Sequence, residues 1–375
     1  MIDFIKRCIF SFLVMFFGYK LIAATGPGEF DLPDSLILSP EAINHLRALV
    51  KSDPDAYKVV SELKKDVNAE IGRPATPLKK IYYEGLVNTD SKRIESVKSL
   101  KQLGDAAMIL RYWQATGDEK AARTLKDWMM AWFETYEPTG NDVNENKLFP
   151  LLVAAFYLRD DLNAESGGRL MEFVGKFAEP HVKAVKESRH MTNRYTKHVR
   201  LAMVCGMILD RPEWTALGEV GVKRFVRESL YADGSSLDLR KRDTLTYHSS
   251  ALRPPLQIAM LSENPEELYT WENAEGASLK KSVEYVVPYA MGEKTREEWT
   301  NSKVGLDHQR AAAGIPEYQK GKLYNPQKAT ELMELAAYFD PELMIVVRHL
   351  SPESGKRFPT WQTLVNESIS TSKAM

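Results

Sequence analysis

Hydrophobic residues recur along this chain at the three- and four-residue spacing of amphipathic helices, and alternating strand patterns are scarce. Ser39-Pro40-Glu41 is predicted to begin a helix, because a serine cap followed by proline is a frequent helix start. The amphipathic segment Ser99–Thr116 is predicted to end at Gly117, and Asp118 to begin a helix that runs to about Tyr136. Further helices are predicted over 147–158, 166–187, 196–209, 212–230, 247–261, 279–289 and 326–338.

Successive helices joined by short turns predict antiparallel helical hairpins packed side by side. No exact repeat, proline-rich linker or break in composition marks a second domain. We therefore expect an all-α fold, an α/α toroid or incomplete barrel of antiparallel helical hairpins. Its groove is expected to be lined by the loops richest in polar and aromatic residues, at 82–88, 137–147, 189–198, 233–246 and 294–322.

The N-terminus has the residue order of a secretory signal. Lys6 and Arg7 precede the apolar run 8–18, and small residues follow at 23–25. We expect residues 1–24 to be a signal peptide, with a retained anchor or a lipid attachment as alternatives, and residues 25–375 to form one domain. The mature protein is then expected to be periplasmic or secreted, without integral membrane contact. Cys205 would be its one cysteine, so no internal disulfide is expected.

The overall charge is close to balanced, with 50 Lys and Arg against 51 Asp and Glu. This balance gives no reason to expect a nucleic-acid partner, since such proteins usually carry a basic excess. A bound anion must instead meet a local basic cluster. The sequence contains no HExxH, P-loop or GxSxG pattern, which argues against zinc proteases, nucleotide-binding proteins and serine esterases.

The window 233–255 places Arg240, Arg242, Tyr247 and His248 close together. Paired guanidinium donors can hold a sugar carboxylate, and a phenol in a cationic neighbourhood can act as a base. This combination suits the removal of a proton next to a uronate carboxylate. The alternative is a helix start, in which Asp243 or Thr244 is the cap, the tyrosine packs and the arginines are solvated.

Two further windows carry donors for an anionic sugar. Asn193, Arg194 and His198 lie in the window 192–198, where Asn193 or Thr196 could instead cap the following helix. Asn144, Asn146 and Lys147 could align a carboxylate or a hydroxyl group, although a loop rich in Asn and Asp is also typical of turns.

Tyr82 and Tyr83 lie in a polar loop and are candidates for a groove wall. Asp142 and Glu145 could in principle bind a metal, but their spacing matches no calcium loop. We therefore expect neither a metal nor a cofactor.

Several of these segments resemble the alginate lyase superfamily. Arg240 followed by Tyr247-His248 is similar to the family's Arg…Tyr-His segment, Asn193 to the second residue of its Asn-Asn-His step, and Tyr83-Glu84-Gly85 to its Tyr-Glu-Gly motif. The chain also resembles a branch of related polyuronate lyases, in the segments 144–148, 301–303 and 310–314.

This resemblance implies an α/α barrel and β-elimination at a 1,4-linked uronic acid, in alginate or glucuronan. It implies that Asn193 and Arg240 neutralise the carboxylate and that Tyr247 takes the C5 proton and returns one to the leaving oxygen. Where the family has His after Asn, this chain has Arg194, so Arg194 or the nearby His198 is expected to replace that histidine. Arg242, His248 and the residues of the other windows are expected to bind substrate: Asn144, Asn146, Lys147, Tyr82 and Tyr83.

Two other functions remain open from the sequence. The departure at Arg194 is consistent with a non-catalytic protein that binds anionic glycans. A glycoside hydrolase on a related helical barrel would need paired carboxylates such as Asp142 and Glu145.

Overall fold

The computed structural model describes residues 32–374 apart from residues 34 and 87–88, and the predicted signal peptide lies outside this part of the chain. The described helices are α1 (Pro40–Ser52), α2 (Pro54–Glu70), α3 (Ser91–Thr116), α4 (Glu119–Thr135), α5 (Asp142–Glu145), α6 (Phe149–Leu158), α7 (Ala164–Glu187), α8 (Asn193–Ile208), α9 (Pro212–Thr215), α10 (Leu217–Ser229), α11 (Leu237–Arg242), α12 (Leu245–Leu261), α13 (Pro265–Thr270), α14 (Leu279–Glu284), α15 (Val287–Ala290), α16 (Gly305–Ala312), α17 (Thr330–Ala336), α18 (Met344–Leu350) and α19 (Trp361–Ala374). None of these described helices is long and apolar enough to cross a membrane.

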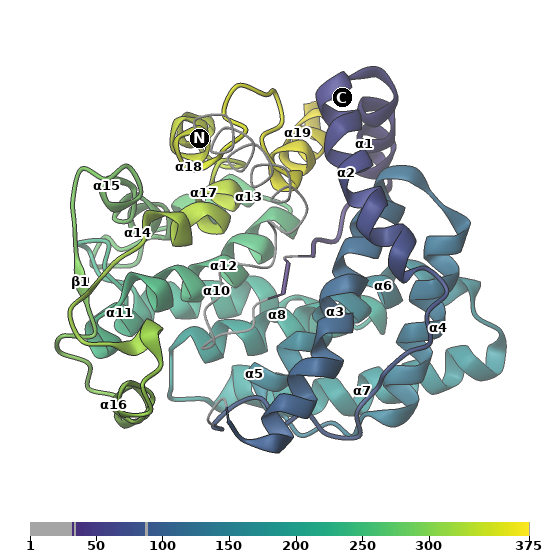
Figure 1. Cartoon of the computed structure of the whole chain (residues 1–375), viewed down its shortest axis with the longest axis horizontal. Coiled ribbons are helices and arrows are strands. Elements are labelled where there is room, and N and C mark those ends of the chain that lie inside the picture. Colours follow the sequence, from purple (N-terminus) through teal and green to yellow (C-terminus); the bar gives the residue numbers. More distant parts are fainter. Residues whose placement is uncertain (1–31, 34, 87–88, 375) are drawn as a thin grey trace, which may run out of the picture.

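Helix composition decides which helices lie inside. α6 and α8 bury residues around most of their circumference, as expected for inner helices, whereas α4 and α7 bury one stripe and expose charged residues on the other side. The inner helices α3, α6, α8, α12 and α17 each pack against the next, and α4, α7 and α10 cover them from outside. This arrangement, visible in Figure 1, is the expected toroid of antiparallel hairpins.

The open side of the ring, between α17 and α3, is spanned by α1 and α19, which pack against each other. An extended segment, residues 35–38, leads into α1 and is buried. Gln114 of α3 donates to the Leu36 carbonyl at 2.9 Å, and Tyr157 of α6 donates to the Leu38 carbonyl at 3.0 Å. The chain therefore enters its first helix through the interior of the ring.

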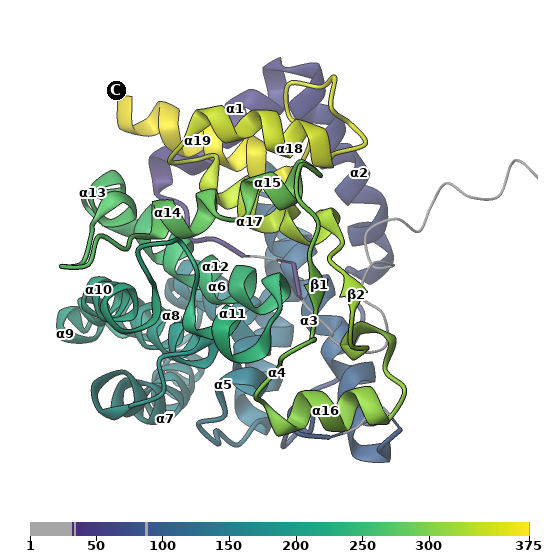
Figure 2. The same ribbon diagram turned by 90° about the vertical axis from the view of Figure 1, so that its left-hand side faces the viewer.

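A small arm, residues 297–323, projects beside the ring. Its base is the antiparallel pair β1 (Glu297–Glu298) and β2 (Lys322–Leu323), with Glu297 opposite Leu323. Between the strands the arm contains α16 and the 3-10 turn η3 (Pro316–Tyr318), and Figure 2 shows α16 at the end away from α15. Trp299, Ile315 and Tyr318 of the arm form a hydrophobic cluster with Tyr247, separate from the main core.

The predicted helix starts and ends are largely confirmed. Ser39 accepts a hydrogen bond from the Ala42 amide at 3.2 Å, Gly117 ends α3 with φ of 73°, and Asp118 caps α4. Four of the five predicted loops were partly wrong, because they contain helical residues. These helices are α5 in the window 137–147, the start of α8 at Asn193, α11 in the window 233–246, and α16 in the window 294–322.

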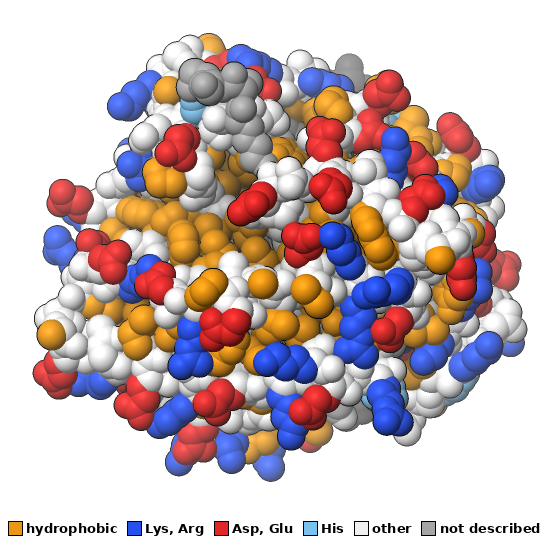
Figure 3. All heavy atoms as spheres, turned by 180° about the vertical axis from the view of Figure 1, so that it is seen from behind, with side chains coloured by type: hydrophobic (Ala, Val, Ile, Leu, Met, Phe, Trp, Pro, Cys, Tyr) orange, Lys and Arg blue, Asp and Glu red, His pale blue; other side chains and the backbone are white. Residues whose placement is uncertain are grey.

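The face opposite that in Figure 1 carries basic and acidic side chains mixed together, with hydrophobic side chains between them (Figure 3). Neither sign of charge dominates this face, which agrees with the formal net charge of −1. Any cavity in which basic side chains outnumber acidic ones is therefore a local feature of this protein.

Candidate active site

A cavity of about 240 Å³ lies where η1 (Asn146–Leu148), α8, α11, α12 and α16 meet. Its wall contains eight lysines and arginines but only two acidic residues, Glu84 and Asp238. The basic residues are Lys147, Arg194, Lys197, Arg200, Lys241, Arg242, Arg253 and Arg310. Such a concentration of one sign, in a chain of balanced charge, attracts an anionic ligand.

Tyr247, in the first turn of α12, lies on this wall with 7% of its surface exposed. Its hydroxyl group accepts a hydrogen bond from Arg310 at 3.1 Å and lies 3.1 Å from the hydroxyl of Tyr318. The guanidinium carbon of Arg242 lies 3.3 Å from the centre of its ring. The phenol therefore meets cationic groups from α11 and from the arm.

Arg242 and Arg240 point in different directions. They are two residues apart on α11, and two steps of about 100° place them on nearly opposite sides of a helix. Arg242 faces the cavity and pairs with Asp307, with 3.0 Å between its Nε and Oδ2 of Asp307. Arg240 pairs with Asp233 at 3.0 Å and lines a different pocket. Arg240 was expected to neutralise the carboxylate of the sugar on which Tyr247 acts, but it does not face the cavity that Tyr247 lines.

The neighbours of Arg242 affect the pKa of its guanidinium. Burial alone would lower the pKa of its guanidinium, but the neighbouring Tyr247 phenol and Asp307 carboxylate outweigh burial and raise that pKa. Arg242 thus stays charged beside the phenol.

His248 lies inside the core. Its Nδ1 lies 2.8 Å from the Ser236 hydroxyl and its Nε2 lies 2.9 Å from the Ser282 carbonyl oxygen. Burial lowers the pKa of His248 to about 4, so the ring is neutral at pH 7. One step along α12 from Tyr247 turns this side chain by about 100°, away from the cavity. The expectation that His248 binds substrate was wrong.

Asn193 is the first residue of α8 and lines the cavity. Its backbone amide donates to Oδ2 of Asp238 at 2.7 Å, so a carboxyl from α11 occupies the place of a helix cap. Among the described residues none hydrogen bonds to the Asn193 side-chain amide, which stays available to a ligand. Burial raises the pKa of Asp238 to about 7.

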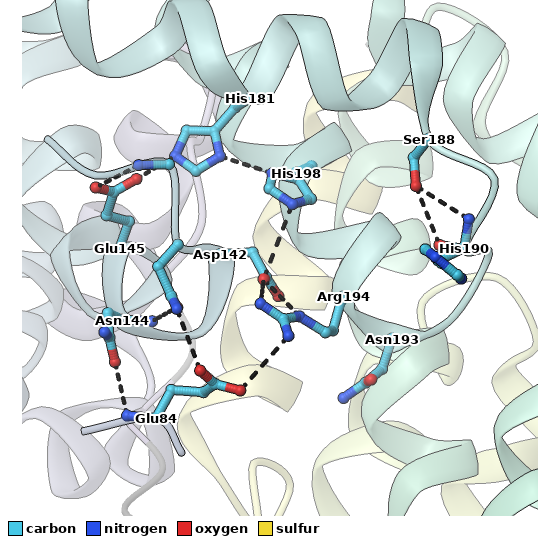
Figure 4. A network of polar contacts seen from close by, with 12 residues as sticks. Glu84, Asp142, Asn144, Glu145, His181, Ser188, His190, Asn193, Arg194 and His198 are labelled. Atoms are coloured by element: carbon cyan, nitrogen blue, oxygen red, sulfur yellow. Dashed lines mark hydrogen bonds and ion pairs between the residues drawn. The ribbon is translucent and has the colours of Figure 1, made fainter. Parts of the chain in front are cut away.

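Arg194 also lines the cavity, and two acidic residues hold it there. Its Nε and Nη2 lie 2.7 and 2.6 Å from Oδ1 of Asp142, and its Nη1 lies 3.5 Å from Oε1 of Glu84 (Figure 4). Burial alone would lower the pKa of Arg194, but the contacts with Asp142 outweigh it and raise that pKa. Arg194 is therefore a charged, prepositioned donor at the position where a histidine was expected from the family pattern.

His198 lies behind Arg194 rather than in the cavity. Its Nδ1 lies 2.7 Å from Nδ1 of His181, whose Nε2 lies 2.8 Å from Oε2 of Glu145 (Figure 4). Burial and the neighbouring His181 lower the pKa of His198 to about 4. A neutral histidine outside the cavity cannot neutralise a substrate carboxylate, so the expected role of His198 at the reacting sugar is not supported.

The predicted residues of the window 141–147 separate into two groups. Asn146 and Lys147 line the cavity, and Lys147 lies 4.9 Å from the ring centre of Tyr83. Asn144 instead fixes the neighbouring loop, because its amide donates to the Ile81 carbonyl at 2.9 Å and accepts from the Glu84 amide at 2.9 Å. Asn144 is therefore a structural residue rather than the substrate ligand that was expected.

The two tyrosines of the predicted groove wall also differ. Tyr83 lines the cavity, and the guanidinium carbon of Arg93 lies 4.0 Å from the centre of its ring. Tyr82 is 43% exposed, contacts Lys92, and does not line the cavity.

Asp142 and Glu145 do not form a hydrolytic carboxylate pair. Both are fully buried and neither lines the cavity. Within the described chain, no group of three or more His, Cys, Asp or Glu residues is placed to bind a metal ion.

Arg310, Tyr318 and Asp238 are among the contributors that the sequence analysis did not single out. Arg310 and Tyr318 reach Tyr247 across more than sixty residues of sequence. Because of this separation in sequence, no local pattern could predict the contact. The resemblance of 310–314 to related polyuronate lyases did indicate that this segment matters.

Comparison with known proteins agrees with this architecture. The structure is similar to an alginate lyase from Bacteroides ovatus, with a TM-score of 0.60 and 13% identity over 87% of this chain and 98% of that chain. It is also similar to alginate lyase A1-III from Sphingomonas species A1, with a TM-score of 0.53 and 16% identity over 80% of this chain and 97% of that chain. At these identities the likeness concerns the fold.

The sequence itself gives the family. Comparison with curated proteins found no similar sequence. The family described as Alginate lyase matches residues 47–297, which is more than half of the chain and includes Asn193, Arg194, Arg242 and Tyr247. The chain therefore belongs to the alginate lyase family and is a polysaccharide lyase.

Proposed function

We propose that this lyase cleaves a 1,4-linked polyuronate, alginate or glucuronan, by β-elimination with Tyr247 as the proton-transfer residue. The observation that carries the proposal is the Tyr247 hydroxyl group on the wall of a cavity with eight cationic side chains. A phenol is a weak base at neutral pH, but adjacent guanidinium groups favour its ionised form. Arg242 and Arg310 supply such groups.

The proposed reaction balances without a cofactor. The phenolate of Tyr247 takes the proton from C5 of the uronate, and the electrons of that C–H bond form the C4–C5 double bond. The C4–O4 bond breaks, and O4 leaves with its electron pair and receives a proton from the phenol. The products are a new reducing end on the leaving chain and an unsaturated uronate at the end of the other.

Charge neutralisation is assigned to groups that face the cavity. Removing the C5 proton delocalises negative charge into the uronate carboxylate, so donors fixed beside that carboxylate stabilise the transition state. We assign this role to the side-chain amide of Asn193 and the guanidinium of Arg194, with Arg242 adding positive charge beside the phenol. Each such donor contributes on the order of 10²–10³ in rate. Arg240 has no part in this assignment.

The proposed substrate class has support from a relative. A tyrosine-to-phenylalanine variant of alginate lyase A1-III, complexed with a tetrasaccharide, has a TM-score of 0.55 with this chain at 14% identity over 81% of this chain and 90% of that chain. The excess of cations over acids in our cavity supports an anionic oligosaccharide here as well.

Tyr247→Phe tests the catalytic assignment. The variant keeps the ring, which packs against Trp299, and loses the hydroxyl group. We expect kcat to fall by about 10²–10⁴ on the polyuronate that the native protein cleaves, measured by the ultraviolet absorbance of the unsaturated product. Tyr57→Phe, at a site 64% exposed on α2, is the matched control and should leave kcat unchanged.

Each result has a clear meaning. An active native protein whose Tyr247→Phe variant has full activity would remove Tyr247 from the mechanism. Tight oligosaccharide binding by the folded native protein, without product from any polyuronate, would instead indicate a protein that only binds anionic glycans. Mass spectrometry separates elimination from hydrolysis, because hydrolysis adds water to the products.

We also propose that the protein is exported to the periplasm or the exterior after cleavage of residues 1–24. The order of charged, apolar and small residues there supports this proposal. N-terminal sequencing of the mature protein tests it. A mature protein that retains Met1 and the apolar run would contradict cleavage.

A further inference from the structure

The arm, residues 297–323, lies almost wholly beyond the residues matched to the family, which end at 297. Its hydrophobic residues form a cluster that is separate from the main core and includes one residue of the ring, Tyr247. Trp299 meets the Tyr247 ring edge-on, with 5.9 Å between ring centres. The arm therefore packs directly on the proposed base.

Polar contacts place the end of the arm on the reacting oxygen atom. The Nη1 atom of Arg310 lies 3.1 Å from the hydroxyl of Tyr247 and 2.5 Å from the hydroxyl of Tyr318, and the two hydroxyls are 3.1 Å apart. One guanidinium thus bridges two phenols. Arg310 also lines the cavity, so this contact lies where substrate would enter.

The base of the arm is fixed to the end of α11. Asp243, which ends α11 with a φ of 54°, accepts hydrogen bonds from Thr300 at 2.7 Å and from the Asn301 amide at 2.9 Å. The backbone amide of Trp299 donates to the Asp243 carbonyl at 2.9 Å. Further along the arm, Asp307 pairs with Arg242. These contacts fix the direction in which α16 presents Arg310.

We propose that Arg310 is a positioning residue of the lyase reaction, which holds the Tyr247 hydroxyl toward the cavity and stabilises its phenolate. The inference rests on the proposed function and extends it to a segment outside the family match. A cation in hydrogen-bond contact with an oxygen atom favours the ionised form of that oxygen. The arm is in this view part of the active site.

Arg310 has a different role from Arg242. Arg242 lies over the face of the Tyr247 ring, and its charge is shared with Asp307, which also accepts from Ser302 at 2.7 Å. Arg310 contacts the oxygen atom itself. The remaining charged groups on the cavity wall come from the 83–84 loop, η1, α8, α11 and α12, and they are Glu84, Lys147, Arg194, Lys197, Arg200, Asp238, Lys241 and Arg253.

The test compares Arg310→Gln and Arg310→Lys with Lys320→Gln, an exposed residue of the same arm. For Arg310→Gln we expect kcat to fall by about 10²–10³ with a smaller change in KM. The acidic limb of the pH profile of kcat/KM should also move to higher pH, because the phenolate loses its cation. Arg310→Lys should recover part of both changes, and Lys320→Gln should match the native protein.

A second measurement does not depend on turnover. The near-ultraviolet absorbance of tyrosinate is titrated in the native protein and in Tyr247→Phe, and the difference gives the ionisation of Tyr247. The same difference is then measured in the Arg310→Gln background. We expect the Tyr247 transition to move to higher pH in that background, whether or not a polyuronate is cleaved.

The outcomes distinguish the two proposals. If the native protein has no lyase activity but the tyrosinate titration moves as expected, the proposed function is contradicted. The effect of Arg310 on the ionisation of Tyr247 would then still be supported. An active enzyme in which Arg310→Gln lowers kcat but leaves both the pH profile and the titration unchanged would overturn the proposal. If circular dichroism shows that Arg310→Gln does not fold, Arg310→Lys takes its place in the test. An Arg310→Lys variant that loses its kcat but keeps the native pH profile and tyrosinate titration would also overturn the proposal.

Discussion

Glu145 is the fully buried acid behind the cavity wall, and its replacement should be strongly destabilising. Its Oε1 accepts from the Thr139 amide at 2.5 Å, the Thr139 hydroxyl at 3.0 Å and the Gly140 amide at 3.1 Å, and Tyr136 donates to it at 3.2 Å. Its Oε2 lies 2.8 Å from Nε2 of His181. Glu145→Ala leaves these donors without their acceptor inside the core.

The size of the effect follows from burial. A buried donor left without its acceptor costs about 1–3 kcal/mol, and several donors lose their acceptor here, so the total is about 3–5 kcal/mol. We expect that loss in the free energy of unfolding of Glu145→Ala at pH 7. Glu145→Gln keeps an acceptor oxygen and loses the charge, so we expect a loss of about 1–2 kcal/mol. Glu165→Gln, which removes an exposed pair with Arg169, should cost less than about 1 kcal/mol.

The pH dependence gives a second check. Burial would raise the pKa of Glu145, but its hydrogen bond to His181, the charge of His181 and the Thr139 donors outweigh burial and lower that pKa below 4.5. The stabilisation is therefore complete above the unfolded value and is lost as the pH falls through the lower folded value. The difference in stability between the native protein and Glu145→Ala should therefore narrow at acidic pH.

Urea unfolding, followed by tryptophan fluorescence at several pH values, measures these differences. A Glu145→Ala variant that loses less than about 1 kcal/mol at pH 7 would refute the reasoning. So would a difference between the two proteins that stays constant from neutral pH down to acidic pH.

Three further expectations follow. Arg242→Ala should lower kcat by about 10²–10³, whereas Arg240→Ala should leave it within about twofold, and equal losses would contradict the separation of the two arginines. Gly221→Ala would bring a Cβ atom to 2.6 Å from Val199, so it should lower the free energy of unfolding by about 1–3 kcal/mol, while Gly175→Ala, with open space around it, should not lower it. Because the cavity attracts polyanions by charge, KM for a polyuronate should rise with ionic strength in steady-state assays, and a KM independent of salt would contradict this.

The helical architecture could be predicted from the sequence because local signals carry it. The caps at Ser39 and Asp118 and the glycine at Gly117 act on neighbouring backbone groups, and the structure confirms them. Short helices were harder, because a six-residue helix such as α11 has too few residues to show a period. The arm was expected only as a loop, since its form depends on contacts with α11.

Local sequence windows also predicted part of the site. Asn193, Arg194, Arg242, Lys147 and Tyr247 do share one cavity. Side-chain direction was the main source of error, because sequence proximity does not give the rotation around a helix. Arg240, expected to neutralise the substrate carboxylate, and His248, expected to bind substrate, therefore point away from the cavity, and Arg310 reaches Tyr247 from a distant segment.

The buried passage of residues 35–38 through the ring has a practical consequence for where the mature chain can begin. A recombinant form trimmed to start at Ser39, the residue that caps the first helix, would remove Leu36, Ile37 and Leu38 from the interior, although it would keep every described helix. Gln114 and Tyr157 would then have lost their carbonyl acceptors next to the opened space. Shortened forms should therefore retain the entire passage, and a purification tag is better placed ahead of it than joined directly to the first helix.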